Sequence, residues 1–274
     1  EYVQFDDNSP IPRLVFKEDA LLDAPPARYD VDKELHRFLR RQRGEVGNVG
    51  GRIAVVADGD SWFDLPEFLG RRAIADVIQA HPDYRMVNLA QWGRTLKSIM
   101  RSRLHEGAIA RELPQYFMFT AGGNDIQEAL ARGALLTRYM AGTPPERYLR
   151  PQGRRLLDYI REQHLDLFSR MGQLYPGMKV LCHGYDFPRP TLRGGRYIGR
   201  HLRDLGFPPQ EMAAVTDFVV KSLGEAIESA AAPLANATFI DLKGKTAMYT
   251  WSDDMHPDSD GFAALASVFI AAMP

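Results

Sequence analysis

Three side-chain types in this sequence stand where they suit nucleophilic catalysis. Ser61 lies in the string DGDSW, and His256 lies in the string DDMH near the end of the chain. A serine hydroxyl is a poor nucleophile unless a neighbouring base takes its proton, and histidine suits that task because its reference pKa lies near neutrality. Asp253 precedes His256 by three residues, a spacing that lets its carboxylate reach the Nδ1–H and fix the tautomer. Asp254 is the alternative partner, and the spacing favours Asp253.

Attack on an acyl carbonyl creates an oxyanion, and stabilising it is usually the largest single catalytic effect. Three groups are candidate hydrogen-bond donors to it: the backbone N–H of Ser61, the backbone N–H of Gly93 and the side-chain amide of Asn124. A glycine at position 93 lets the backbone approach the substrate without a Cβ in the way. Asn124 is therefore expected to matter nearly as much as the nucleophile and the base.

Each of these residues also has a plainer interpretation. Ser61 suits the N-cap of a helix after the preceding strand, which is a common position for serine. Gly93 and Asn124 are both typical of turns, and His256 before a proline is typical of a surface loop. Taken singly, Ser61 and Gly93 favour the plainer interpretation. The presence of all these residues in one chain favours nucleophilic catalysis.

Four segments of the chain resemble, in order, the four sequence blocks of the GDSL/SGNH hydrolases: GDS, a lone Gly, GxND and DxxH. Their key letters fall on Ser61, Gly93, Asn124 and His256, with Asp253 as the acid of the last block. The resemblance extends over residues 52–272. It implies a serine esterase, lipase or carbohydrate O-deacetylase that works through an acyl-Ser61 intermediate without a metal or organic cofactor. Ester substrates would be small molecules or carbohydrates, and which acyl and alcohol groups they carry stays open.

Regular elements must bring these segments together. Five short apolar runs read as buried strands, at residues 52–57, 85–89, 116–120, 179–182 and 238–242. Longer stretches with helical spacing separate them, at residues 95–113, 154–174 and 209–231, and an apolar terminal helix is expected at 261–273. Alternating strands and helices predict an α/β fold, a doubly wound parallel sheet with helices on both faces. The family resemblance implies a flavodoxin-like strand order.

In such sheets, ligands bind outside the carboxyl ends of the strands. Three of the four segments directly follow a predicted strand, and the fourth lies between the last strand and the last helix. The same rule places His183 and Tyr185, which follow the fourth run, on the active-site edge. We therefore list these two and Trp62 as candidate substrate-lining residues, although loop ordering or packing explains them equally well.

The first 50 residues differ from the rest. Residues 1–28 are proline-punctuated and aperiodic, which is typical of an extended arm, and residues 31–43 read as a short helix. Residues 1–50 are thus expected to form an N-terminal extension and residues 51–274 the hydrolase domain. The first residues lack the pattern of a signal peptide, and because they do not begin with Met the compartment stays open.

Composition narrows the function classes. The formal net charge is −1, which disfavours a nucleic-acid surface, and a lone cysteine, Cys182, allows no intramolecular disulfide. No apolar run reaches the roughly 18 residues of a membrane span. Residues 132–203 hold fourteen Lys/Arg and five Asp/Glu. This basic stretch forms either a solvated face or a surface that attracts an anionic substrate. No sequence feature decides the oligomeric state.

Three other interpretations compete with the GDSL-type esterase. Asp58 and Asp60 after a strand resemble the paired aspartates of haloacid-dehalogenase-like phosphatases, but Trp62 stands where those enzymes have Thr or Val. An α/β-hydrolase elbow needs a second glycine where this chain has Phe63. The third alternative is a non-catalytic carbohydrate-binding or assembly module on the same fold, because fold alone does not determine function.

Overall fold

The computed structural model describes residues 3–6, 13–16, 51–65 and 70–274. At the N-terminus, β1 (Val3–Asp6) pairs antiparallel with β2 (Arg13–Phe16), and the sequence pattern predicted neither strand. The predicted helix at 31–43 lies outside the described residues. The division into an arm and a hydrolase domain therefore remains a prediction.

A five-stranded sheet forms the centre of the molecule. Its members are β3 (Ile53–Asp58), β4 (Tyr84–Asn88), β5 (Tyr116–Phe119), β6 (Lys179–His183) and β7 (Ala237–Ile240). All neighbours are parallel, and the order is β4-β3-β5-β6-β7, which is the flavodoxin-like order. The five predicted runs match these strands to within two residues at each end, so the predicted fold class is confirmed.

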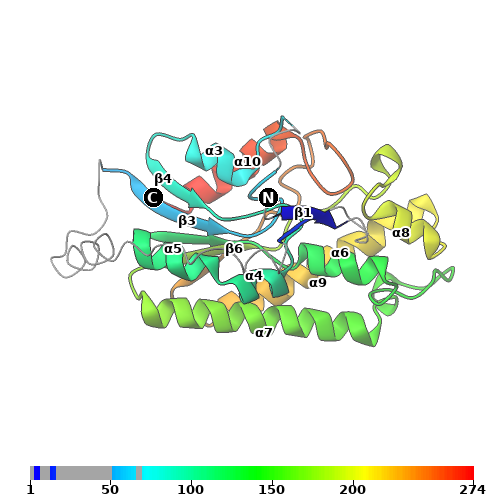
Figure 1. The fold of residues 1–274 in the computed structure, drawn as a ribbon. Helices are drawn as coiled ribbons and strands as arrows, with labels where there is room; N and C mark the ends of the chain where they lie inside the picture. Colours follow the sequence, from blue (N-terminus) through cyan, green and yellow to red (C-terminus); the bar gives the residue numbers. More distant parts are fainter. Residues whose placement is uncertain (1–2, 7–12, 17–50, 66–69) are drawn as a thin grey trace.

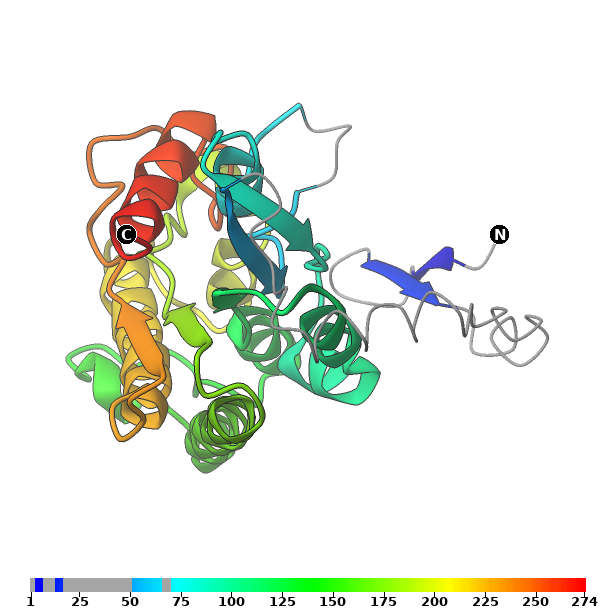
Figure 2. The same ribbon diagram turned by 90° about the vertical axis from the view of Figure 1, so that its left-hand side faces the viewer.

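Helices cover both faces of this sheet. On one face lie α3 (Ile74–Gln79) and α10 (Ser259–Ala271), which pack on each other. On the other face lie α4 (Leu96–Ser102), α5 (Leu104–Glu112), α7 (Pro151–Leu174) and α9 (Pro209–Ala231), of which α7 and α9 run side by side. Two further helices, α6 (Gly123–Ala131) and α8 (Gly199–Asp204), extend from the loops. Figures 1 and 2 show the two helical layers around the sheet.

One predicted helix is divided in two. The stretch 95–113 was expected to be continuous, whereas Arg103 separates α4 from α5 with a left-handed backbone, φ 50°. A residue in this conformation ends a helix, because its backbone leaves the helical path. The helices α3, α6 and α8 were not predicted, since six to nine residues are too few to establish a helical period.

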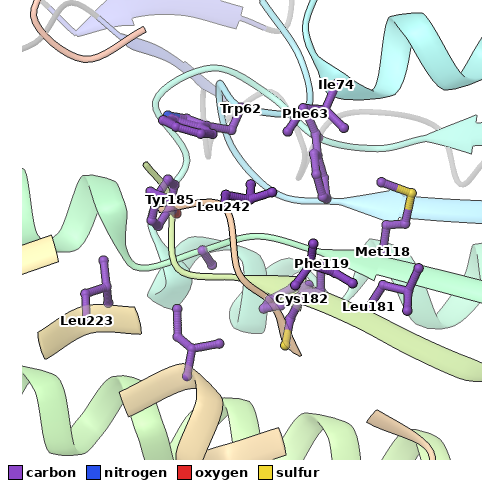
Figure 3. Packing of buried hydrophobic residues seen from close by; sticks show 14 of the residues in the cluster. Trp62, Phe63, Ile74, Met118, Phe119, Leu181, Cys182, Tyr185, Leu223 and Leu242 are labelled. Atoms are coloured by element: carbon purple, nitrogen blue, oxygen red, sulfur yellow. The ribbon is translucent and has the colours of Figure 1, made fainter. Parts of the chain in front are cut away.

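The core lies on both sides of the sheet, as Figure 3 shows around β5 and β6. Phe119 faces α7 and packs edge-on against Phe168, with ring centroids 6.2 Å apart. Phe63, which follows the β3 loop, packs edge-on against Phe269 of α10 at 5.7 Å. Both phenylalanines of the first pair and Phe63 are fully buried. Phe63 therefore anchors the loop that carries Ser61 in the core.

Among the described residues, no helix is both long and apolar enough to cross a lipid bilayer.

Candidate active site

Four loops bring the candidate residues to the carboxyl edge of the sheet. Ser61 follows β3, Gly93 follows β4, and Asn124 is the second residue of α6 directly after β5. His256 lies between β7 and α10, in a loop closed by an isolated bridge between Trp251 and Pro257. The sheet order places β3 between β4 and β5, so these three loops are neighbours.

The serine, the histidine and the first aspartate form a continuous hydrogen-bonded chain. His256 Nε2 lies 2.9 Å from Ser61 Oγ, although the two residues are 195 positions apart. His256 Nδ1 lies 2.9 Å and 3.1 Å from the two carboxylate oxygens of Asp253. When Nδ1 carries the proton, Nε2 is free to accept the hydroxyl proton of Ser61. Ser61 and His256 are each 3% exposed, so most of their surface is shielded from solvent.

Asp253 is held as a charged acceptor. It accepts the backbone N–H of Met255 at 2.8 Å and that of His256 at 2.9 Å. Burial opposes its charge, but the hydrogen bond from the His256 ring, the charge of that ring and the two backbone donors together hold its pKa below the usual value. Arg71 lies 3.6 Å from the outer carboxylate oxygen. The carboxylate is therefore ready to stabilise an imidazolium when His256 takes a proton.

Asp254 has a different partner set. Its fully buried carboxylate accepts the backbone N–H groups of Tyr197, Ile198 and Gly199, at distances of 2.6–3.1 Å. The Tyr197 ring then packs edge-on against the His256 ring, with centroids 6.1 Å apart. Of the two adjacent aspartates, only Asp253 contacts the histidine side chain, and Asp254 fixes the segment that covers it.

The three expected oxyanion donors lie in neighbouring loops. Asn124 Nδ2 donates to the backbone oxygen of Arg94 at 2.9 Å, which links the α6 start to the loop of Gly93. Gly93 has a left-handed backbone, φ 81°, that favours glycine. Within the described part of the chain, the N–H groups of Ser61 and Gly93 donate to no protein acceptor, although both residues are buried. Backbone N–H groups are strong hydrogen-bond donors, so two that lack a protein acceptor are available to a ligand.

Sequence reasoning missed the role of Arg94. Its guanidinium donates to Asp58 at 2.5 Å and to the Leu89 carbonyl at 3.0 Å, while its own carbonyl receives Asn124. The second carboxylate oxygen of Asp58 lies 2.9 Å from Nδ1 of the buried His105. Arg94 thus holds the Gly93 loop against both the β3 end and Asn124. The only sequence signal was its position directly after Gly93.

A close backbone approach explains the glycine before Asp60. A Cβ on Gly59 would lie 2.3 Å from Thr120 Cγ2 and 2.6 Å from the Thr120 carbonyl oxygen. Only a residue without a side chain therefore lets the β3 loop lie this close to the end of β5. The same loop accepts the Gln91 N–H through the Gly59 carbonyl at 3.1 Å.

Tyr185 joins the loop of Ser61 to the loop of Asn124. Its hydroxyl donates to Asp60 at 2.6 Å and accepts the Gly123 N–H at 3.0 Å. Burial raises the pKa of Asp60 to about 6, against the opposing effect of hydrogen bonds from Tyr185 and from the backbone of Trp62. Tyr185 has a left-handed backbone, φ 69°, which is unusual for a residue with a side chain. The structure thus maintains a strained residue to bridge the two loops.

Asp60→Asn is expected to flatten the pH dependence of stability between about pH 4 and pH 7. Because the Asp60 pKa is raised on folding, its contribution is fully present below the unfolded value of 3.8 and is lost as the pH rises through about 6. Asparagine keeps an acceptor for Tyr185 but does not titrate. A rise in pKa of this size corresponds to about 3 kcal/mol at neutral pH.

Urea unfolding of both proteins at pH 4.5 and pH 7.5 measures this difference. Asp158→Asn, at an exposed position of α7, is the matched control and should keep the wild-type dependence. Parallel pH profiles for wild type and Asp60→Asn would rule out the titration of Asp60 in this range.

Two pockets adjoin the Ser61–His256 pair. The first is mostly apolar, has Ser61, Asn124, Trp62 and Tyr185 in its wall, and spans about 710 Å³, part of which is open to solvent. Its apolar lining comes from α6, α8, α9 and the adjoining loops and includes Ile126, Leu130, Leu135, Leu136, Ile198, Leu202, Val219, Val220 and Leu223. The second pocket lies on the His256 and Asp253 side and contains arginines. Sequence reasoning missed both linings, because their residues come from separate elements.

The structure separates the three candidate substrate-lining residues. Trp62 and Tyr185 line the apolar pocket, and their rings meet edge-on at 5.3 Å, as Figure 3 shows. His183 does not line it, and its fully buried ring packs between Trp62, Phe63 and Phe269. Burial lowers the pKa of His183 to about 3, so this histidine is an uncharged core residue.

No protein-family model matches the sequence, and no curated protein matches it. Three solved structures resemble the fold. An extracellular lipase from Streptomyces rimosus has 16% identity and a TM-score of 0.51, over 80% of this chain and 99% of that one. A lipase from goat rumen metagenome has 14% identity and a TM-score of 0.53, over 80% and 97%. A protein from Parabacteroides merdae described as a GDSL-like lipase has 15% identity and a TM-score of 0.50, over 83% and 98%. The chain therefore has the fold of the GDSL-type lipases, as its four sequence segments predicted.

Proposed function

We propose that this protein is a serine esterase of the GDSL/SGNH type, with Ser61 as nucleophile, His256 as general base and Asp253 as its orienting acid. The observation that carries the proposal is the chain of contacts from Asp253 through His256 to Ser61, at 2.9 Å for each link. The unpaired N–H groups beside Ser61 support it, because they supply donors where the oxyanion would form.

The reaction follows in two steps. His256 Nε2 takes the Ser61 proton while Oγ attacks the carbonyl carbon, and the protonated ring then gives that proton to the departing alcohol. A water molecule, deprotonated by His256, next attacks the acyl-Ser61 ester, and Ser61 recovers its proton when the acid leaves. During both steps the N–H groups of Ser61 and Gly93 and the amide of Asn124 stabilise the oxyanion. The start of α6 adds the positive end of a helix dipole there.

The apolar pocket supports an acyl group of several carbons. Ser61 and Asn124 stand in its wall, so the tail of a carbonyl bound between them points toward the aliphatic lining. Each buried methylene contributes about 0.8 kcal/mol, so affinity should rise with chain length until the pocket is full. We therefore infer that acyl esters longer than acetate are the better substrates.

Two alternatives receive less support. A phosphatase needs an attacking aspartate, but Asp58 is fully buried and both its carboxylate oxygens are engaged, by Arg94 and Gly59 and by His105. A non-catalytic binding module on this fold would not need a base aligned on a buried serine, and His256 is aligned on Ser61. We keep the binding module as the outcome that a failed labelling experiment would favour.

The proposal is tested with p-nitrophenyl acetate, butyrate and octanoate, in buffer with and without EDTA, and with a fluorophosphonate probe. We expect hydrolysis that is insensitive to EDTA, kcat/KM that rises from acetate to octanoate, and a single phosphonylated peptide that contains Ser61. If the folded protein shows no hydrolysis and no labelling, the esterase proposal is overturned in favour of the binding module.

A substitution in the pocket tests the acyl assignment separately. Val220→Phe adds volume to the apolar lining and should lower kcat/KM for the octanoate about tenfold relative to the acetate, because overfilling a packed site costs about 1–3 kcal/mol. Val268→Phe, at a similarly half-buried site on α10, is the control and should keep the wild-type ratio. Equal losses for both esters would place the acyl chain elsewhere.

A further inference from the structure

The second pocket beside His256 carries an excess of positive charge. Its wall includes Arg71, Arg193 and Arg196, and its one acidic residue is Asp253. Arg71 is already paired with that aspartate at 3.6 Å. Arg193 and Arg196 have no carboxylate partner anywhere in the described part of the chain. Two arginines are therefore left to bind an anion from outside the protein.

The arrangement of this pocket suits a ligand next to the histidine. The Arg196 guanidinium lies over the Tyr197 ring, 5.3 Å from its centroid, which restricts the side chain. Tyr197 in turn packs against His256 and is anchored through its backbone N–H to the buried Asp254. Arg196 is thus held next to Tyr197, the residue that packs against His256. Arg193 lies three residues before Arg196 in the same segment, and both line the pocket.

The chemistry of the triad decides which part of a substrate enters this pocket. The departing oxygen must lie within hydrogen-bond reach of His256 Nε2, because that nitrogen returns the proton to it. His256 lines the arginine pocket and not the apolar one, whereas Ser61 and Asn124 line the apolar one. The acyl chain and the alcohol of one ester therefore extend in different directions from Ser61.

The apolar pocket cannot serve an anion. No Lys, Arg or His stands in its wall, and its charged residues are Asp60 and Asp186. A negative group on the acyl chain would meet those carboxylates in an apolar setting, which is unfavourable. A negative group on the alcohol would instead meet two unpaired guanidinium groups, whose planar donors match carboxylate and phosphate oxygens.

We propose that the preferred substrates are esters of an apolar carboxylic acid with an alcohol that carries an anionic group, a phosphate or a carboxylate, bound by Arg193 and Arg196. This inference rests on the proposed esterase function and names the alcohol side of the substrate. Hydrolysis adds one water and releases the apolar acid and the anionic alcohol, with no other reactant.

The test compares substrates with and without an anionic group on the alcohol. One pair is 1-octanoylglycerol 3-phosphate and 1-octanoylglycerol, and the other is octanoyloxyacetate and its primary amide, with released octanoate as the readout. We expect wild type to favour each anionic ester about tenfold in kcat/KM, the scale of two partly solvent-screened ion pairs. The preference should weaken as salt is added, since salt screens exposed charges. The larger preference of the two pairs identifies the anion as phosphate or carboxylate.

The double variant Arg193→Gln/Arg196→Gln should bring the anionic-to-neutral ratio close to one. Because the ratio is measured within one protein, it does not depend on the fraction that is folded. Arg154→Gln/Arg155→Gln, exposed on α7 and outside both pockets, is the matched control and should keep the wild-type ratio.

The outcomes separate this inference from the function on which it rests. Hydrolysis of the neutral ester that depends on Ser61, with no preference for the anionic ester, overturns the inference and leaves the esterase intact. A preference that survives in the double arginine variant also overturns it. Failure to hydrolyse any of the four esters overturns the esterase itself.

Discussion

Ser61→Ala is expected to lower kcat for ester hydrolysis about a millionfold, to a residual rate supplied by substrate binding and the oxyanion donors. The hydroxyl removed is the one that lies 2.9 Å from His256 Nε2, and no other serine is hydrogen-bonded to that nitrogen in the described residues. Steady-state hydrolysis of p-nitrophenyl octanoate measures the loss, and fluorophosphonate labelling of the variant should disappear.

The control is Ser267→Ala on α10, which removes an exposed hydroxyl bonded only to the Ala263 carbonyl. It should keep wild-type kcat and wild-type labelling. Because Ser61 donates no structural backbone bond, the Ser61 variant should also unfold at nearly the wild-type urea concentration. A Ser61→Ala protein that retains a tenth of the wild-type rate would show that another group is the nucleophile.

Asn124→Ala is expected to lower kcat by about 10²- to 10³-fold, with a much smaller change in KM. Its amide has one hydrogen bonded to the Arg94 carbonyl at 2.9 Å, which orients the side chain, and the other hydrogen is available to the oxyanion. A donor that acts mainly on the developing charge stabilises the transition state more than the ground state, so the loss falls on kcat. Asn124→Asp should be at least as damaging, because a carboxylate offers no donor and repels the oxyanion.

A structural amide provides the matched control for this substitution. Asn236 Nδ2 donates to the Phe168 carbonyl at 3.0 Å, just before β7 begins and therefore at the opposite edge of the sheet. Asn236→Ala should lower the urea midpoint yet keep kcat per folded molecule. If Asn124→Ala raised KM and left kcat unchanged, its amide would be a ground-state binding group and the oxyanion assignment would fail.

Strand positions were predictable because a strand buried on both faces leaves a short, continuous apolar run. The string IAVVAD of β3 has five buried residues of six, and nothing in it competes with a strand assignment. The long helices α7 and α9 were predictable for a similar reason, since they are long enough to display their period. The break at Arg103 was not, because the left-handed backbone of an arginine leaves no signature in residue type.

The candidate site divides in the same way. The letters of the four segments and their order along the chain made Ser61, Gly93, Asn124 and His256 candidate site residues from the sequence alone. The sequence favoured Asp253 over Asp254 through its spacing of three residues from His256, but it could not show the surroundings of either carboxylate. The fold separates them: one carboxylate reaches the imidazole, and the other receives three backbone N–H groups of residues 197–199.

By itself the sequence determined which residue types are available for chemistry, the α/β class and the strands after which the candidate residues stand. These properties are local, since each depends on a few neighbouring residues. Only the tertiary structure decided which side chains meet: Ser61 with His256 across 195 positions, Asn124 with the Arg94 carbonyl, and two of many arginines beside His256. Contact, burial and charge pairing depend on how the strands are ordered and the loops are anchored, and no local pattern carries that information.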